Sequence, residues 1–188
     1  MAVLCRLRST SRLRPQIISR FRKAADGSAS LEFALIAIPF FVLLFALIEV
    51  ALAFFASQYL ETATADAARQ IMTGRTQAAK LDRGAFTNAV CNNLKALMNC
   101  NAVVVDVQTV TSFAGVNTTG PSRNSDGSVN YSGTGYNPGG GSDIVVVKVY
   151  YEWPVMIPTF GLAIGDLPNG KRLLQATAVF RNEPFPSS

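Results

Sequence analysis

The chain has 188 residues, of which 49% are hydrophobic, with a net charge of +5 and no histidine. This composition suits one membrane segment joined to one domain of about 130 residues, which is large enough to bury a core. The absence of histidine excludes or much weakens Ser-His-Asp sites, Cys-His sites and the common zinc sites. No catalytic residue, metal site or cofactor is predicted, and the protein is not expected to be an enzyme.

Residues 1–27 form a basic leader. It contains seven cations and one acid, a net charge of +6, whereas the remaining chain sums to −1. Because positive charge before a membrane segment stays in the cytoplasm, the leader predicts a cytoplasmic N-terminus and an exported C-terminal domain. The alternative, an arm that binds nucleic acid, is disfavoured, because the charge directly precedes an apolar run and suits lipid headgroups. No nucleic-acid partner is therefore predicted.

The segment 28–56 is predicted to be a transmembrane helix. From Phe33 to Ala56 it contains 24 residues with a single charge, Glu49. At about 1.5 Å per residue this run is about 36 Å long, against a hydrocarbon core of about 30 Å. It exceeds the apolar stretch of a signal peptide, and no Ala-x-Ala cleavage site follows it. Pro39 is expected to kink the helix.

Glu49 lies on a stripe of small residues formed by Ala46, Ala53 and Ala56. Small residues let transmembrane helices approach closely, and a buried acid needs a partner. The stripe therefore predicts a helix-packing face on which Glu49 contacts another subunit. The alternative is a carboxyl near the outer interface that reaches water or stays protonated.

The segment 57–188 is predicted to be an exported α+β domain. The first helix continues to about Thr73 and stops at Gly74, and Asp82 caps a second helix. The apolar residues of this second helix recur at helical spacing and are predicted to be core: Phe86, Val90, Leu94, Leu97 and Met98. Alternating or β-branched patterns predict three strands. They cover residues 102–111, 143–152 and 173–182.

Two connections carry separate expectations. Residues 112–142 are rich in Gly, Ser, Asn and Thr, and so long an irregular segment is expected to be flexible or ordered by a partner. Residues 153–165 are unusually apolar for a connection. They predict a core flap or a subunit contact, with a membrane-dipping loop as the less favoured alternative.

Cys91 and Cys100 form an even pair in the exported part, which predicts a disulfide, whereas Cys5 lies in the leader. On one unbroken helix the pair would be about 13.5 Å apart, too far for a bridge. The helix that carries Cys91 must therefore end before Cys100. The alternative is two unrelated buried thiols.

The motif Gly27-Ser28-Ala29-Ser30-Leu31-Glu32-Phe33, placed between a basic leader and an apolar helix, resembles the type III signal of type IV pilins and pseudopilins. The resemblance is closest to the TadE-like pseudopilins of tight-adherence (Flp) pilus systems, and it extends to the acid at Glu49 and to the closing strand. It implies a pilin-like fold and cleavage after Gly27 by an aspartic prepilin peptidase. It also implies that Glu32 pairs with the terminal amine of a neighbouring subunit.

The function predicted from this resemblance is that of a non-enzymatic minor pseudopilin of the bacterial inner membrane. The simplest major Flp pilins are far shorter and carry Glu-Tyr in place of Glu32-Phe33, which favours a minor subunit. The expected partners are membrane lipid, prepilin peptidase, other pseudopilins, pilin and the assembly platform. Two alternatives remain: an uncleaved membrane-anchored scaffold, and a membrane-anchored periplasmic module that binds a ligand through residues 112–142.

Overall fold

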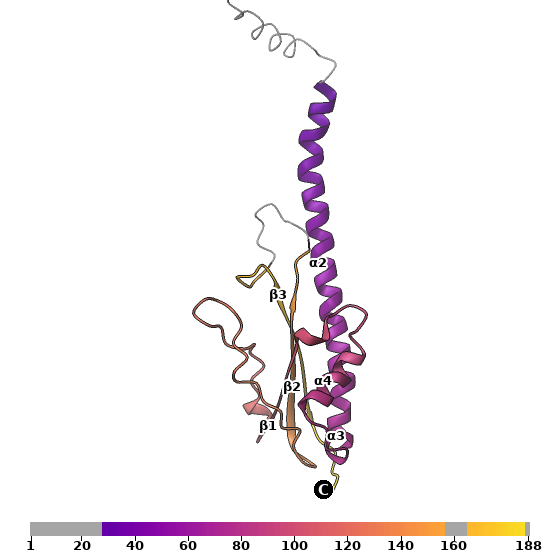
Figure 1. Cartoon of the computed structure of the whole chain (residues 1–188), viewed down its shortest axis with the longest axis vertical. Coiled ribbons are helices and arrows are strands. Elements are labelled where there is room, and N and C mark those ends of the chain that lie inside the picture. Colours follow the sequence, from indigo (N-terminus) through magenta and orange to yellow (C-terminus); the bar gives the residue numbers. More distant parts are fainter. Residues whose placement is uncertain (1–27, 157–164, 187–188) are drawn as a thin grey trace, which may run out of the picture. The chain divides into compact units, whose positions relative to one another are not determined.

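The computed structural model describes residues 28–156 and 165–186. Its elements confirm the predicted α+β class and appear in Figure 1. The helices are α2 (Ser28–Met72), α3 (Arg75–Ala78) and α4 (Arg83–Asn92), and the strands are β1 (Val103–Val110), β2 (Ile144–Trp153) and β3 (Arg172–Arg181). The chain divides into two compact units, residues 1–44 and 45–188. The basic leader lies outside the described residues.

The described part of the first unit is the beginning of α2, with Pro39 inside the helix. Its large apolar side chains are exposed, Phe33 to 71% and Ile36 to 70%. By length and composition, α2 is the one described helix that could cross a membrane. Side chains of this kind avoid water, so lipid or a protein partner is their expected environment.

The core of the second unit lies between the remainder of α2 with α4 and one face of the sheet. The three strands are antiparallel in the order β1-β2-β3. Val105 pairs with Val149, and Val149 pairs with Ala176, so alternate residues of all three strands share this face. Leu60 and Ile71 of α2 are fully buried against it. The valine face and the apolar face of α2 are thus the two halves of one core.

The second helix begins where the sequence predicts. Asp82 accepts a hydrogen bond through Oδ1 from the Ala85 amide, 2.7 Å away, which satisfies a free donor of the first turn. Phe86 and Val90 are fully buried. The apolar pattern continues after α4 ends at Asn92, but Leu97 is 37% exposed, so its prediction as a core residue was wrong. The chain there turns rather than continuing the helix, which rotates Leu97 outward.

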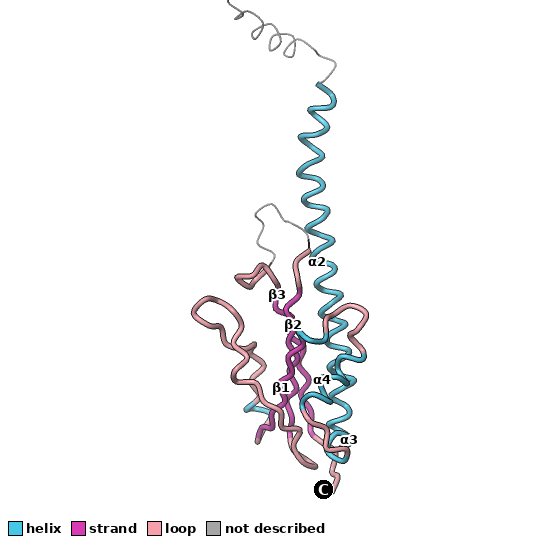
Figure 2. The backbone as a smooth tube through the Cα atoms, in the orientation of Figure 1, coloured by secondary structure: helices cyan, strands magenta, loops and turns pink. Residues whose placement is uncertain are grey.

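Residues 112–142 cover the other face of the sheet, as Figure 2 shows. The Val107 amide donates to the Gly135 carbonyl, and the Asn137 amide donates to the Val107 carbonyl. Gln175 of β3 donates to the Thr118 carbonyl, 2.9 Å away. The segment that the sequence expects to be flexible or partner-ordered thus makes hydrogen bonds to the first and third strands of its own chain.

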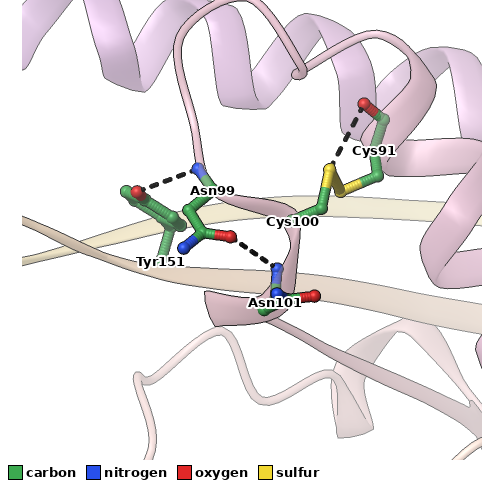
Figure 3. Close-up of a disulfide and its surroundings, with 5 residues drawn as sticks. All are labelled: Cys91, Asn99, Cys100, Asn101 and Tyr151. Atoms are coloured by element: carbon green, nitrogen blue, oxygen red, sulfur yellow. Dashed lines mark hydrogen bonds between the residues drawn. A yellow bond between two sulfur atoms is a disulfide. The ribbon is translucent and has the colours of Figure 1, made fainter.

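The structure joins Cys91 and Cys100 in a disulfide with the Cα atoms 5.6 Å apart (Figure 3). This approach is possible because α4 ends directly after Cys91 and the chain turns back. The Asn99 amide donates to the Tyr151 hydroxyl, 3.2 Å away, so the returning segment is also held to β2. The bridge and this hydrogen bond together tie the end of α4 to the sheet.

Replacing Cys91 and Cys100 with serine should lower the free energy of unfolding by about 2–3 kcal/mol, because the bridge restricts the unfolded chain across a short loop. Denaturant unfolding of the full-length protein in detergent, followed by circular dichroism, measures the loss. Cys5→Ser is the matched control and should leave the midpoint unchanged. An equal midpoint for the double variant and the control would contradict the stabilising role.

Candidate functional site on the long helix

Three of the four residues predicted for processing, Ser28, Glu32 and Phe33, lie at the start of α2. Gly27 is outside the described residues, and Ser28 is the first residue of the helix. Glu32 and Phe33 follow in the first turns, and both are exposed. Their geometry matches a helix that presents an acid and an aromatic ring to its surroundings.

Glu49 lies in the second unit and is only 1% exposed. Its Oε1 atom accepts a hydrogen bond from the Met156 amide, 3.3 Å away. Met156 lies three residues beyond the end of β2, so this bond joins α2 to the start of the β2–β3 connection. A buried carboxylate needs such donors, because removal from water is costly when its oxygens are unmatched.

The other members of the predicted stripe are placed at different depths. Ala53 and Ala56 are buried in the core of the second unit, and Ala46 is half-buried. The small side chains of Ala53 and Ala56 let the rest of the domain pack closely against α2. The structure therefore brings Glu49, Ala53 and Ala56 together within one chain, whereas Glu32 lies in the other unit.

Met156 was not among the predicted site residues. It acts through its backbone amide, which every residue except proline possesses, so its side chain gives no sequence signal. The contact also spans 107 residues. Residues 157–164, the greater part of the apolar connection, lie outside the described residues. Whether this connection is a core flap, a subunit contact or a membrane-dipping loop therefore stays a prediction.

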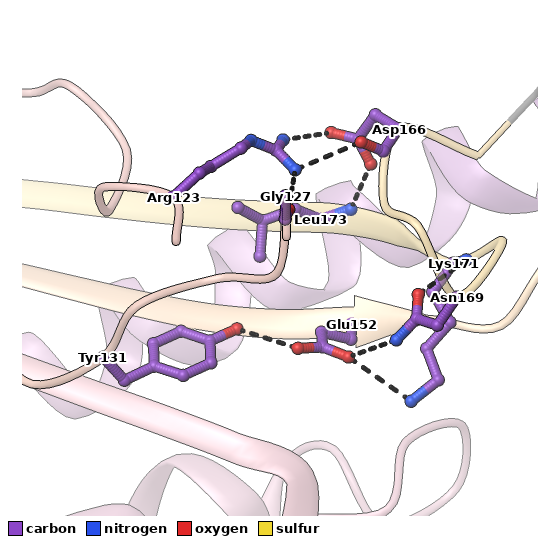
Figure 4. A network of polar contacts seen from close by, with 8 residues as sticks. All are labelled: Arg123, Gly127, Tyr131, Glu152, Asp166, Asn169, Lys171 and Leu173. Carbon is purple, nitrogen blue, oxygen red and sulfur yellow. Dashed lines mark hydrogen bonds and ion pairs between the residues drawn. The ribbon is translucent and has the colours of Figure 1, made fainter. Parts of the chain in front are cut away.

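A polar network on the other face of the sheet joins residues 112–142 to the β2–β3 connection (Figure 4). Glu152 accepts hydrogen bonds from the Tyr131 hydroxyl at 3.4 Å and from Asn169 at 3.2 Å. An ion pair connects Arg123 with Asp166 across 3.2 Å, and both side chains are partly exposed. Exposed pairs of this kind contribute little to stability, so they mainly set the position of the loop.

A cavity of about 260 Å³ lies between residues 112–142 and the sheet. Asp106 is 5% exposed and accepts from the Gly135 amide at 2.8 Å. Lys148 donates to the Thr119 carbonyl at 3.4 Å. Asp106 and Lys148, the charged residues that line the cavity, therefore both have hydrogen-bond partners within the chain. Among the described residues, no group of three His, Cys, Asp or Glu side chains could hold a metal ion.

Three tyrosines have raised pKa values. Burial, with the nearby charge of Glu152, raises the pKa of Tyr131 to about 12. Burial also raises the pKa of Tyr150 to about 12, with a contribution from the charge of Asp106, and that of Tyr136 to about 12. These hydroxyls stay protonated near neutral pH and act as neutral hydrogen-bonding groups.

The model of the TadE-like protein family matches residues 27–69. The match begins at the predicted processing site and covers α2 almost to its end, and it leaves the sheet outside. It confirms the resemblance to TadE-like proteins over this segment. Comparisons with curated proteins and with solved structures find no match.

Alkaline pH should destabilise the second unit. The folded pKa of Tyr131 and Tyr150 is about 12, above the unfolded value of about 10. The stability that the two protonated hydroxyls contribute is therefore fully present below about pH 10 and is lost as the pH rises toward about 12. Urea midpoints measured at several pH values across this window should fall, and less steeply for the Tyr131→Phe/Tyr150→Phe variant. An identical fall in that variant would contradict the assignment.

Removing the Glu49 carboxylate should also lower stability. Glu49→Ala leaves the Met156 amide without this acceptor, at a cost of about 1–3 kcal/mol. Glu49→Gln retains a carbonyl acceptor and should lose less. Denaturant unfolding in detergent measures both, with the exposed Glu61→Ala on the same helix as the control. If Glu49→Ala and Glu61→Ala unfold alike, the buried acceptor has no structural role.

Proposed function

We propose that the protein is a non-enzymatic minor pseudopilin, an assembly subunit of a Flp-type (tight-adherence) pilus. The observation that carries the proposal is the TadE-like match over residues 27–69. The matched segment coincides with an apolar helix whose side chains are exposed along its first half. TadE-like proteins are associated with the Tad pilus, and a helix of this kind suits both membrane insertion and helix–helix packing in an assembly.

The proposed location is the inner membrane, crossed once by the apolar part of α2, with the N-terminus in the cytoplasm and the domain of residues 57–188 in the periplasm. The charge difference across α2 supports this orientation, since seven cations precede the apolar run. The disulfide between Cys91 and Cys100 supports it independently. Disulfides persist in oxidising compartments such as the periplasm and are rare in the cytoplasm.

The proposed mechanism begins with cleavage between Gly27 and Ser28 by a prepilin peptidase on the cytoplasmic face. The new terminal amine then lies four residues from Glu32. A carboxylate in hydrocarbon is stabilised when it meets an opposite charge, so Glu32 would pair with the amine of a neighbouring pseudopilin or pilin. The assembly platform would collect such subunits from the bilayer, and the domain would remain outside.

Glu49 has a different role in this proposal from the subunit contact that the sequence favours. Its carboxylate is buried and accepts from the Met156 amide within the chain. Glu32, which is exposed, is therefore the better candidate for an intersubunit ion pair. Ala46, which is half-buried, remains available for part of a helix-packing face.

The ligand-binding alternative would use the cavity between residues 112–142 and the sheet. Asp106, Gln108 and Lys148 line this cavity. Each is hydrogen-bonded to residues 112–142: Asp106 to the Gly135 amide, Gln108 to the Gly133 carbonyl and Lys148 to the Thr119 carbonyl. These bonds position the loop. The assembly role has the better support, because the family match lies on the helix. The other alternative, an uncleaved scaffold, differs from the proposal only at the N-terminus.

Intact-mass measurement tests processing. In cells that contain the cognate prepilin peptidase, the mature chain should begin at Ser28, whereas Gly27→Leu should retain the whole leader. Cells that lack the peptidase provide the control for other proteases. A wild-type mass that begins at Met1 in the presence of the peptidase would favour the uncleaved scaffold.

Substitution at Glu32 tests the proposed ion pair. Glu32→Gln should reduce pilus assembly strongly, because the neutral amide cannot neutralise an amine in hydrocarbon. Glu32→Asp retains the charge and should assemble better than Glu32→Gln. Pili counted by electron microscopy give the measurement, and Glu61→Gln on the same helix is the control. Normal assembly of Glu32→Gln would refute the pairing.

A further inference from the structure

One end of the second unit has exposed apolar side chains and one cation near α2. We name Phe54, Phe55, Met156 and Arg172 the juxtamembrane surface. Phe54 is 63%, Phe55 60% and Met156 61% exposed. Phe55 stacks on Tyr59 with ring centroids 6.3 Å apart. Met156 follows the end of β2 and Arg172 begins β3, since Trp153 pairs with Arg172 across those strands. Phe54 of α2 lies beside Arg172, and Phe55 is the next residue of that helix.

Arg172 differs from the other cations of the described residues. It is half-buried and lines a depression of about 40 Å³ together with Ala53, Phe54 and Ser57. In the part of the chain that the structure describes, the other half-buried cations have hydrogen-bond partners, but Arg172 has no ion pair or hydrogen bond through its guanidinium. Those paired cations are Arg83, Lys148 and Lys171.

The exposed apolar residues of α2 set the level of this surface in a membrane. Large exposed apolar side chains occur along α2 from Leu31 to Phe55, and beyond that point Leu60 and Ile71 are buried in the domain. A hydrocarbon core of about 30 Å takes about 20 helical residues. A span that begins near Leu31 therefore ends close to Glu49, and Phe54 and Phe55 lie at the level of the headgroups.

The chemistry at this level fits a phospholipid. Aromatic rings are enriched at the membrane–water interface, and a guanidinium binds phosphate oxygens in a two-pronged geometry. Arg172 is half-buried beside Ala53 and Phe54, and arginine at interfaces usually packs its stem on apolar surface with its charged end toward water. Glu49 of α2 is buried and bonded to the Met156 amide, so it does not place a negative charge on the exposed surface.

We propose that the juxtamembrane surface binds a phospholipid of the outer leaflet of the inner membrane, with Arg172 on the phosphate and Phe54, Phe55 and Met156 in the interfacial layer. The inference rests on the membrane anchoring proposed above. It gives the domain a fixed contact with the bilayer in addition to its helix. A subunit with such a contact presents the domain to the assembly machine at a defined height.

Native mass spectrometry of the full-length protein in detergent, titrated with phosphatidylglycerol, tests the proposal. Arg172→Gln should weaken phospholipid retention about fivefold, which corresponds to the contribution of one cation near a membrane surface. Arg172→Lys should retain part of the binding, because it keeps the charge but loses the two-pronged geometry. Arg181→Gln, at the other end of β3, is the matched control and should bind as the wild type does.

Further measurements separate the possible outcomes. Equal unfolding midpoints for Arg172→Gln and wild type would show that the domain is intact and support a direct contact. If inorganic phosphate displaces the phospholipid completely, the site is a simple anion site and the proposal fails. If Arg172→Gln binds phospholipid normally but no longer co-purifies with other pilus subunits, the surface is a protein interface and the proposal again fails.

Alkaline extraction of cell membranes distinguishes this inference from the proposed function. Wild-type protein released from the membrane by this treatment would overturn the anchoring and the phospholipid contact together. Protein that stays in the membrane while Arg172→Gln retains phospholipid like the wild type would overturn only the contact at Arg172.

Discussion

A single helix must satisfy two different surroundings along its length, and the rest of the structure depends on how it does so. Over its first half, α2 exposes large apolar side chains in every direction, as a lipid environment permits. Over its second half, one face carries Leu60, Ala67 and Ile71 into a core formed with the valine face of the sheet. The exposed part of α2 gives way to the part packed in the domain around Glu49. There a carboxylate is buried and bonded to the backbone of the β2–β3 connection.

Both faces of the sheet and the outer edge of β1 are covered by other parts of the same domain. A sheet of three strands has two faces and two edges, and the helices cover only one face. Residues 112–142 cover the other face and hydrogen-bond along β1, so the outer edge of that strand also has partners. Arg83 of α4 donates to the Val105 carbonyl at 2.6 Å and to Thr134, which joins the helical layer to this loop across the edge of the sheet. An edge that is paired in this way is less available for unwanted association.

Much of the architecture could be predicted from periodicity. The alternation around Val105 and Val107 and the β-branched run after Asp143 predict strands because such patterns bury one face of a sheet or both. Leu97 shows the limit of the same reasoning. Its spacing continues that of Phe86 and Val90, but the helix ends at Asn92, so helical periodicity no longer describes where its side chain points. The motif at Gly27 could be recognised from sequence because it consists of features in a fixed order: a basic leader, the glycine, an acid beside an aromatic residue, and an apolar helix.

The sequence by itself determined the composition of the leader, the length of the apolar run, the cysteine pair and the residues of the TadE-like segment, since each is a property of neighbouring positions. Only the tertiary structure decided that Glu49 lies inside its own chain and that residues 112–142 lie across the sheet. It also decided that Arg172 lies beside Ala53 and Phe54. These contacts join positions tens of residues apart through backbone groups or packing, and local patterns carry no information about which distant segment will supply the other half of a contact.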